Sequence, residues 1–249
     1  MRFVRFEYQG REQYGQIQGD RVLALEGDLF GRWRTTDESL PLAGVRLLAP
    51  CKPSKMLCVG LNYRSHLQGR PEPQKPELFW KPSSAVIGPE EAIVLPSDAT
   101  NTHPEGELVV VIGARASHVS VAEASRCILG YTLGNDVSER SWQEGDRQWW
   151  RAKGCDTFAP MGPWIETEFD LANAALSTRI NGDLVQEGTL NELIFGVPEV
   201  ISFASRYVTL EPGDVIFTGT PGHTRAMEPG DRIEITVSGL GTLSNSVMG

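Results

Sequence analysis

A short apolar run, Leu108–Ile112, closed by Gly113, constrains the fold of this chain more than any other segment. Consecutive β-branched and apolar residues followed by a glycine predict a buried strand. Glu105 and Glu107 come just before this run, at spacing i, i+2. If the strand extends back through them, both carboxylates point to the same face, with Cα atoms about 6.5 to 7 Å apart.

Two carboxylates this close repel each other, and each raises the pKa of the other unless a cation lies between them. A hard divalent ion with oxygen ligands resolves the conflict, and Mg²⁺ commonly uses only a few carboxylates. Acids that flank a strand are more often solvated edge residues. The pair alone therefore leaves both interpretations open.

A third acid, Asp136, follows the apolar stretch Gly130–Gly134. A carboxylate at the end of a strand is exposed toward whatever binds there. Asp is also a common N-cap, and a helix can begin near Ser138. Spacing alone does not separate these two roles.

The length, composition and charge limit the kinds of partner that the chain can bind. With 249 residues, 40% of them hydrophobic, the chain is long enough for one large domain, with or without a small appendage. A net charge of −9 argues against nucleic acid and anionic membranes as partners, because the long-range field repels phosphate. An anionic small molecule is still possible, since its binding depends on local charge and on any metal.

The cysteines and the first residues predict a cytoplasmic protein. Four cysteines are scattered without CxxC spacing, which favours reduced thiols over disulfides or a zinc site: Cys51, Cys58, Cys127 and Cys155. Cys155 lies near candidate functional residues, although a small buried side chain is the commoner role. No apolar run has the length of a signal peptide or a membrane span.

Residues 1–50 predict a small N-terminal β domain built from short hairpin strands, with a structural or dimer-forming role. Residues 51–249 form the second unit. It contains a buried strand at Met56–Gly60, followed by His66 on a polar turn, where catalytic residues concentrate. A surface histidine with a local hydrogen bond is an equally good interpretation. Another strand, Leu78–Pro82, contains Lys81.

Further along, Ser120 and Glu123 form a capping box for a helix. Residues 151–163 combine turn-forming residues with Arg, Lys and Asp, as in a solvated connector or a ligand-contacting loop. The C-terminal part predicts mainly strands, with an Asn181-Gly182 hairpin, a helix over 197–207, and twin turns at 211–214 and 228–231.

Taken together, the ordered motifs of residues 51–249 resemble the fumarylacetoacetate hydrolase family. The motifs that carry the resemblance are Val59–Tyr63 with His66, Phe79–Pro82, Glu105–Leu108 with Val111–Gly113, Gly130–Thr132 with Asn135–Ser138, Arg140 with Gln143, Lys153 with Asp156–Phe158, the Asn181-Gly182 hairpin, and Leu210–Asp214 with Thr218–Pro221.

This resemblance implies an α+β, mainly β fold: a mixed β-sandwich roll, usually a homodimer, that uses Mg²⁺ (or Mn²⁺ or Ca²⁺) to bind 2-oxo acids or their enols. It assigns Glu105, Glu107 and Asp136 as metal ligands. Lys153 matches an active-site lysine, and His66 matches a histidine that activates water. The residues implied to contact substrate are Arg140, Gln143, Thr220 and Lys81.

Gly69 departs from the family pattern. Short hydrolase and decarboxylase members resemble Asn-Tyr-x-x-His-x-x-Glu, where the Glu orients the His, and Gly69 stands at that last position. Without this carboxylate, His66 loses a partner that raises its basicity and fixes its tautomer. Glu72 is a possible substitute.

The expected chemistry is electrophilic catalysis on a 2-oxo acid from the breakdown of aromatic compounds. Hydrolysis of a C–C bond, isomerisation of 2-hydroxyhepta-2,4-diene-1,7-dioate and decarboxylation all fit, and Lys153 beside a cation is expected to have a lowered pKa. The alternative is a protein that binds metal and oxo acid without turnover.

Overall fold

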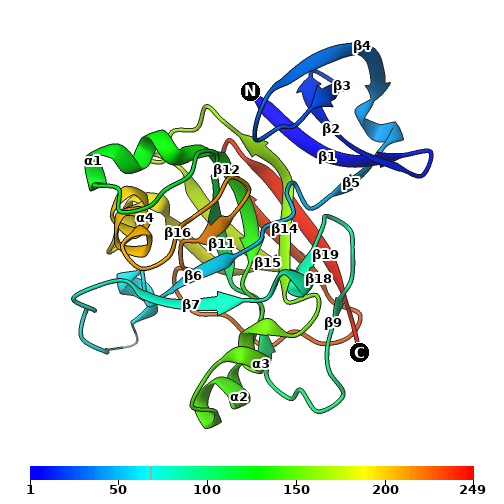
Figure 1. Ribbon diagram of the computed structural model, residues 1–249. Helices are drawn as coiled ribbons and strands as arrows, with labels where there is room; N and C mark the ends of the chain where they lie inside the picture. Colours follow the sequence, from blue (N-terminus) through cyan, green and yellow to red (C-terminus); the bar gives the residue numbers. More distant parts are fainter. Residues whose placement is uncertain (68) are drawn as a thin grey trace.

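The structure, a computed structural model, describes residues 1–67 and 69–249. Strands dominate, and the helices are short (Figure 1), which confirms the predicted α+β, mainly β class. The strands are β1 (Arg2–Tyr8), β2 (Arg11–Gln18), β3 (Arg21–Gly27), β4 (Trp33–Pro41), β5 (Arg46–Leu48), β6 (Met56–Gly60), β7 (Glu77–Lys81), β8 (Val86–Ile87), β9 (Ile93–Val94), β10 (Thr102–His103), β11 (Gly106–Ile112), β12 (Ile128–Asn135), β13 (Ser138–Glu139), β14 (Ala159–Glu166), β15 (Ala175–Ile180), β16 (Asp183–Thr189), β17 (Val215–Phe217), β18 (Arg232–Val237) and β19 (Gly241–Met248).

Two sheets form the body of the molecule. The larger has the order β4-β3-β2-β1-β14-β12-β11-β17-β6-β7, and the smaller has the order β16-β15-β18-β19-β9. Most neighbours are antiparallel, whereas β17 and β6 are parallel. The predicted mixed sandwich is therefore present.

Strand β11 is buried on both faces, which explains its uninterrupted apolar sequence. Leu108 and Val110 belong to a core that includes Leu176 and Ile235 of the smaller sheet. Val109 and Val111 face the opposite way and belong to a second core with residues such as Phe217. Because alternate side chains enter different cores, a one-residue shift of register would exchange them.

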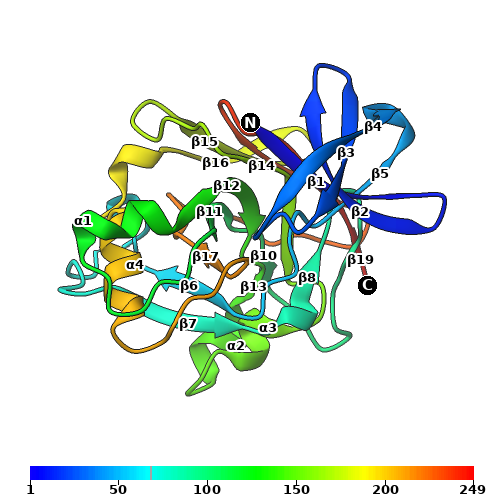
Figure 2. The same ribbon diagram turned by 45° about the horizontal axis from the view of Figure 1, so that its top comes forward.

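The first fifty residues form an antiparallel meander at one end of the body, blue in Figure 1 and still to one side in the turned view of Figure 2. The meander continues the larger sheet, because Arg2 and Phe3 of β1 pair with Glu166 and Ile165 of β14. A domain boundary near residue 50 stays a prediction.

The helices lie outside the sheets. Helix α1 lies beside α4, and α2 lies beside α3 in a separate pair (Figures 1 and 2). The predicted capping box is present in α1, where the backbone N–H of Ser120 donates to Glu123 Oε2 over 3.0 Å. The helical elements are α1 (Val121–Ala124), α2 (Arg140–Gly145), α3 (Trp150–Gly154), α4 (Val197–Ser205) and the 3₁₀ turns η1 (Leu42–Gly44), η2 (Arg64–His66), η3 (Ser83–Ala85), η4 (Ser125–Cys127) and η5 (Leu190–Glu192).

The turn chemistry of the C-terminal half was predicted correctly. Asn181 and Gly182 both have positive φ, 54° and 86°, as a tight hairpin between β15 and β16 requires. Helix α4 carries Pro198 in its first turn. The two Glu-Pro-Gly-Asp turns lead into β17 and β18.

The structure corrects the expectation of a loop over residues 151–163. Helix α3 covers Arg151 to Gly154, and β14 begins at Ala159. Pro160 lies in β14, where the parallel contact with β8 is short. Tertiary pairing thus overrides the local preference of the prolines and glycines for turns.

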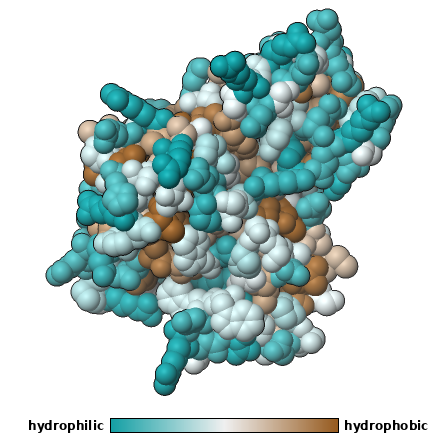
Figure 3. Space-filling model, in the orientation of Figure 1, coloured by the Kyte–Doolittle hydropathy of each residue, from teal (hydrophilic) through white to brown (hydrophobic). Residues whose placement is uncertain are grey.

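The surface seen in Figure 3 is mostly hydrophilic, with hydrophobic side chains in small separated areas. None of the helices in the described ranges combines the length and apolarity needed to span a bilayer. All four cysteines are free. Cys155 is half-buried, and burial raises the pKa of its thiol, which disfavours the reactive thiolate.

Candidate metal centre and cavity

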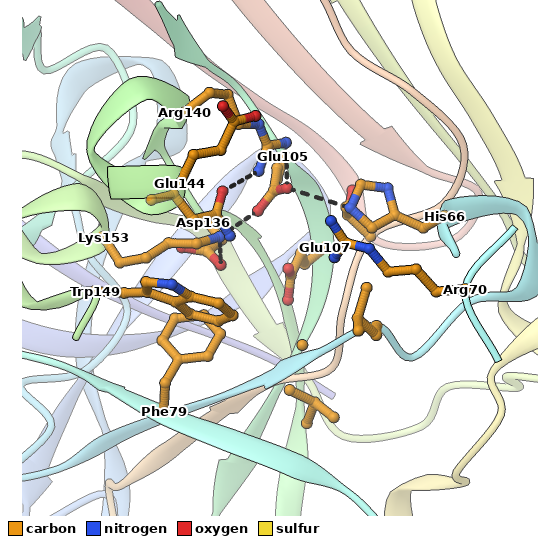
Figure 4. Close-up of a pocket in the computed structure, with 15 residues that line it drawn as sticks. His66, Arg70, Phe79, Glu105, Glu107, Asp136, Arg140, Glu144, Trp149 and Lys153 are labelled. Atoms are coloured by element: carbon orange, nitrogen blue, oxygen red, sulfur yellow. Dashed lines mark hydrogen bonds and ion pairs between the residues drawn. The ribbon is translucent and has the colours of Figure 1, made fainter. Parts of the chain in front are cut away.

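A cavity of about 220 Å³ opens beside the ends of β11 and β12. Its walls come from widely separated segments, which the sheet order brings together (Figure 4). The residues that line it are Val59, Gly60, Leu61, His66, Arg70, Phe79, Glu105, Glu107, Asp136, Arg140, Gln143, Glu144, Trp149, Lys153 and Thr220.

Three buried carboxylates converge in this cavity. Glu105, Glu107 and Asp136 each offer an oxygen within 4.8 Å of the others. Glu107 lies in β11 and Glu105 directly before it, while Asp136 follows β12. Asp136 is not a helix cap, because the side chain of Glu139 accepts from Ser141 N at the start of α2. The question that spacing left open is thus resolved in favour of the strand-end position.

Buried cations compensate two of these three acids. Lys153 Nζ lies 2.6 Å from Glu105 Oε2 and 2.7 Å from Asp136 Oδ2. Arg140 contacts the other oxygen of Glu105 over 2.5 Å. Lys81 Nζ lies 2.6 Å from Asp136 Oδ1. Paired and hydrogen-bonded in this way, both charges are tolerable in the interior.

Glu107 is different, because no ion pair to its carboxylate is found among the described residues. It accepts one hydrogen bond, from the backbone N–H of Gly219 over 2.7 Å. Burial, then Asp136, then Glu105 raise its pKa well above the ordinary carboxyl value. The buried Glu107 carboxylate is repelled by two like charges, and a bound divalent cation would offset that repulsion. The three side chains therefore fit a metal site with oxygen ligands.

The backbone donor to Glu107 depends on a close approach. Gly219 has φ +99°, and a Cβ there would lie 2.8 Å from Cβ of Asn62. Asn62 in turn donates to the carbonyl of Thr218 and accepts from Phe195 N. These contacts hold the segment after β17, which carries Gly219, against the turn that leads to His66.

The carboxylates around Lys153 shift its pKa upward, and the lowered pKa expected beside a bound cation stays a prediction. Burial disfavours its charged form, but Asp136 and Glu105 outweigh burial and raise the pKa of the ammonium above its ordinary value. Beside these two carboxylates Lys153 is a hydrogen-bond donor and a positive charge. Its ammonium also lies 5.0 Å from the centre of the Phe79 ring.

Lys81 is placed differently from the expected substrate contact. Its side chain is fully buried, and its ammonium contacts Asp136 and the carbonyl of Val137. It is absent from the described residues that line the cavity. Lys81 therefore contacts Asp136 from outside the cavity lining and does not face a ligand.

His66 projects into the cavity from η2 (Figure 4). Its Nδ1 lies 2.6 Å from the carbonyl oxygen of Gly222, and its Nε2 lies 3.6 Å from Glu105 Oε1. Because a carbonyl only accepts, Nδ1 carries the proton, and Nε2 faces the carboxylate cluster with Glu105 Oε1 beyond hydrogen-bond distance. Glu72 is engaged elsewhere, with Arg64 at 2.6 Å, so the suggested substitution by Glu72 is not seen.

The other expected ligand contacts line the cavity. Arg140 also donates to Gln143 Oε1 over 2.8 Å, which fixes both side chains. The hydroxyl of Thr220 donates to the carbonyl of Gly106 and accepts from Gln186. Its hydrogen bonds are therefore already made within the protein.

Sequence reasoning missed three lining residues, Arg70, Glu144 and Trp149. The ring of Trp149 packs edge-on against Phe79, with centroids 5.4 Å apart, and supplies the apolar side of the cavity. The aromatic pair at residues 149 and 150 was a usable signal. Arg70 follows a glycine in a proline-rich tract and gave none.

Comparison with known proteins agrees with this geometry. Residues 55–248 match the family model described as fumarylacetoacetate (FAA) hydrolase C-terminal, and residues 1–50 match one described as Rv2993c-like, N-terminal. Protein Rv2993c of Mycobacterium tuberculosis is 48% identical over 88% of this chain and 84% of its own length. Human oxaloacetate tautomerase FAHD2A, mitochondrial, is 38% identical over 84% of this chain and 71% of its own.

Solved structures are similar along the whole chain. The 2-hydroxyhepta-2,4-diene-1,7-dioate isomerase of Mycobacterium marinum superposes with a TM-score of 0.94 at 42% identity, covering 100% of this chain and 98% of its own. Maleylpyruvate hydrolase of Sphingobium sp. SYK-6, in complex with manganese(II) and pyruvate, gives 0.83 at 29% identity, covering 100% and 99%.

Proposed function

Because this chain belongs to the fumarylacetoacetate hydrolase family, we propose that it is a divalent-metal-dependent enzyme that moves a proton between a 2-oxo acid and its enol. One observation carries the proposal: Nε2 of His66 points toward a cluster of three buried carboxylates that lines the same small cavity, and it lies 3.6 Å from Oε1 of Glu105. Glu105, Glu107 and Asp136 would hold Mg²⁺, Mn²⁺ or Ca²⁺. The relatives with isomerase and tautomerase names support proton transfer more than hydrolysis, since the hydrolase compared above is less similar.

The chemistry that a bound divalent ion would supply here is stabilisation of negative charge on the keto oxygen of the substrate. The protein residues then do the remaining work. Lys153 and Arg140 bring fixed positive charge to the same side of the cavity, where the substrate carboxylate would lie.

His66 is the residue placed to move the proton. The C–H bond beside the keto carbon breaks, its proton passes to Nε2, and its electron pair forms the new C=C bond while charge moves to the oxygen. Returning the proton to that oxygen gives the enol. In a substrate with a further conjugated C=C bond, returning the proton to a more distant carbon restores the keto group and moves the double bond. No water is consumed, which suits a site without the family glutamate at position 69.

The test is metal-dependent exchange of the C3 protons of 2-oxo acids into D₂O, followed by proton NMR. With Mg²⁺ the wild type should exchange these protons, and without Mg²⁺ or with Glu107→Ala it should not. Binding of Mg²⁺ and oxalate without exchange or turnover of any 2-oxo acid would favour the alternative, a binding protein. Release of pyruvate from acylpyruvates would make the enzyme a hydrolase instead.

The homodimer, the absence of nucleic-acid and membrane partners, and the cytoplasmic location remain predictions. A place in the catabolism of aromatic compounds is likewise part of the proposal, and a growth phenotype on aromatic acids would test it.

A further inference from the structure

Arg70 brings a positive charge into the cavity that the proposed mechanism does not use. It follows η2 in the chain and extends from the loop beside His66 toward the carboxylates (Figure 4). Among the described residues, its guanidinium has no ion pair and no hydrogen bond, and the residue is exposed. An arginine aimed into a cavity without a partner points to an anionic ligand.

The other cations of the cavity are already engaged. Lys153 bridges Glu105 and Asp136, and Arg140 binds Glu105 and Gln143. Arg70 is therefore the lining cation that is left for a ligand, within the part of the chain that the structure describes. Its planar fork suits a carboxylate bound through both oxygens.

Charge balance points to a ligand with two negative charges. The four carboxylates that line the cavity are matched in number by Arg70, Arg140, Lys153 and, behind Asp136, Lys81. A divalent cation in the carboxylate cluster leaves an excess of two positive charges. A 2-oxo acid with one carboxylate neutralises half of that excess, whereas a 2-oxo diacid neutralises all of it.

The volume limits the length of the ligand. The cavity, of about 220 Å³, is small beside the roughly 300 to 1,000 Å³ of a typical ligand pocket. A small cavity favours a short ligand. Gly69, with φ +83°, adopts the left-handed backbone conformation that glycine tolerates best, and Arg70 follows directly.

We infer that Arg70 recognises the second carboxylate of a short 2-oxo dicarboxylic acid, and so determines substrate specificity. This inference rests on the proposed function, which places the 2-oxo acid end at the carboxylate cluster. The arginine takes up a position beside the site of the missing family glutamate, and it contributes anion recognition instead of orienting His66.

The experiment compares matched ligands that differ only at the far end. Oxaloacetate against 2-oxobutanoate, and 2-oxoglutarate against 2-oxopentanoate, replace a carboxylate by a methyl group. Affinities are measured by calorimetry on the full chain with Mg²⁺, and C3 proton exchange gives kcat/KM for the same ligands. The variants are Arg70→Gln and Arg70→Lys, and the control is Arg64→Gln, since Arg64 lies nearby in η2 and pairs with Glu72.

The wild type should prefer each diacid at least ten-fold, and Arg70→Gln should lose that preference while keeping its affinity for the monoacids. Arg70→Lys should restore part of it, and Arg64→Gln should behave as the wild type. An unchanged preference in a folded Arg70→Gln protein would overturn the inference. If diacid and monoacid bind equally while exchange persists, only the role of Arg70 fails; if no 2-oxo acid binds, the proposed function fails with it.

Discussion

His66 Nδ1 lies 2.6 Å from the carbonyl oxygen of Gly222, a residue 156 positions further along the chain. This contact fixes the tautomer, because a carbonyl oxygen accepts only from a protonated nitrogen. Ser65 strengthens the same junction, since its hydroxyl accepts from Gly222 N over 3.1 Å. A backbone group thus orients the imidazole where the sequence lacks a carboxylate at position 69.

Replacing His66 with Gln should lower kcat for C3 proton exchange by about 10²- to 10⁴-fold, the range for loss of a positioned general base. Binding of Mg²⁺ should be unchanged, because the imidazole is not among the three clustered carboxylates. Exchange kinetics and calorimetry measure the two effects. His118→Gln, on an exposed turn, is the matched control. A His66→Gln enzyme with wild-type exchange would remove His66 from the mechanism.

Glu107→Gln should abolish stabilisation by Mg²⁺ without harming the metal-free protein. Gln keeps the acceptor for Gly219 N and removes a charge that is buried against Asp136 and Glu105. In the wild type, Mg²⁺ at 100 times its Kd should add about 2.7 kcal/mol to the free energy of unfolding. Urea unfolding with Mg²⁺ or with EDTA measures this difference.

Glu144→Gln is the control for that measurement, because Glu144 lines the cavity outside the carboxylate cluster. It should respond to Mg²⁺ as the wild type does. An equal response in Glu107→Gln would show that the ion, if bound, does not use Glu107.

The sequence predicted most of the scaffold because its signals are local. The apolar run Leu108–Ile112 can only be buried, and Asn181-Gly182 suits a turn with two positive φ values. The loop expected over 151–163 failed for the opposite reason. There β14 is formed by pairing with β1 and β12, which lie far away in sequence.

The candidate site was predictable only where the side-chain type itself carries the chemistry. Glu105, Glu107 and Asp136 were found as acids, and the structure brings them together. The carbonyl of Gly222 was not predictable, since every residue has one. The direction of Arg70 depends on the turn at Gly69, and Lys81 could not be placed behind Asp136 without knowing the pairing of β7 with β6.

Asp214 should make stability depend on pH at the acidic end. Burial favours its neutral form, but hydrogen bonds from Lys55, Ser54 and the backbone of Glu211 and Lys55 outweigh burial and lower its pKa below the ordinary 3.8. A lowered folded pKa means that the charge stabilises the fold fully above the ordinary value, and that this contribution is lost as pH falls through the folded pKa. Asp214→Asn should cost about 2 kcal/mol at pH 7.

Urea unfolding of both proteins at pH 7 and near pH 3 checks the sign: the difference between them should shrink at the lower pH. Asp231 is the matched control, because it occupies the same place in the second Glu-Pro-Gly-Asp turn and its hydrogen bonds are exposed. Asp231→Asn should cost clearly less. A gap between wild type and Asp214→Asn that widens on acidification would contradict the assigned direction.

Lys81→Met should destabilise the fold by about 3 kcal/mol or more, because it removes one partner of a buried ion pair and leaves Asp136 less compensated. Met has a similar length and fills the space, so the loss reports charge rather than packing. Lys52→Met, which breaks the exposed pair with Glu12, should change the free energy of unfolding by less than about 1 kcal/mol. Urea unfolding in EDTA measures both variants without any contribution from metal. If the two substitutions cost the same, Lys153 alone would suffice to hold Asp136, and the pair between Lys81 and Asp136 would not be needed for stability.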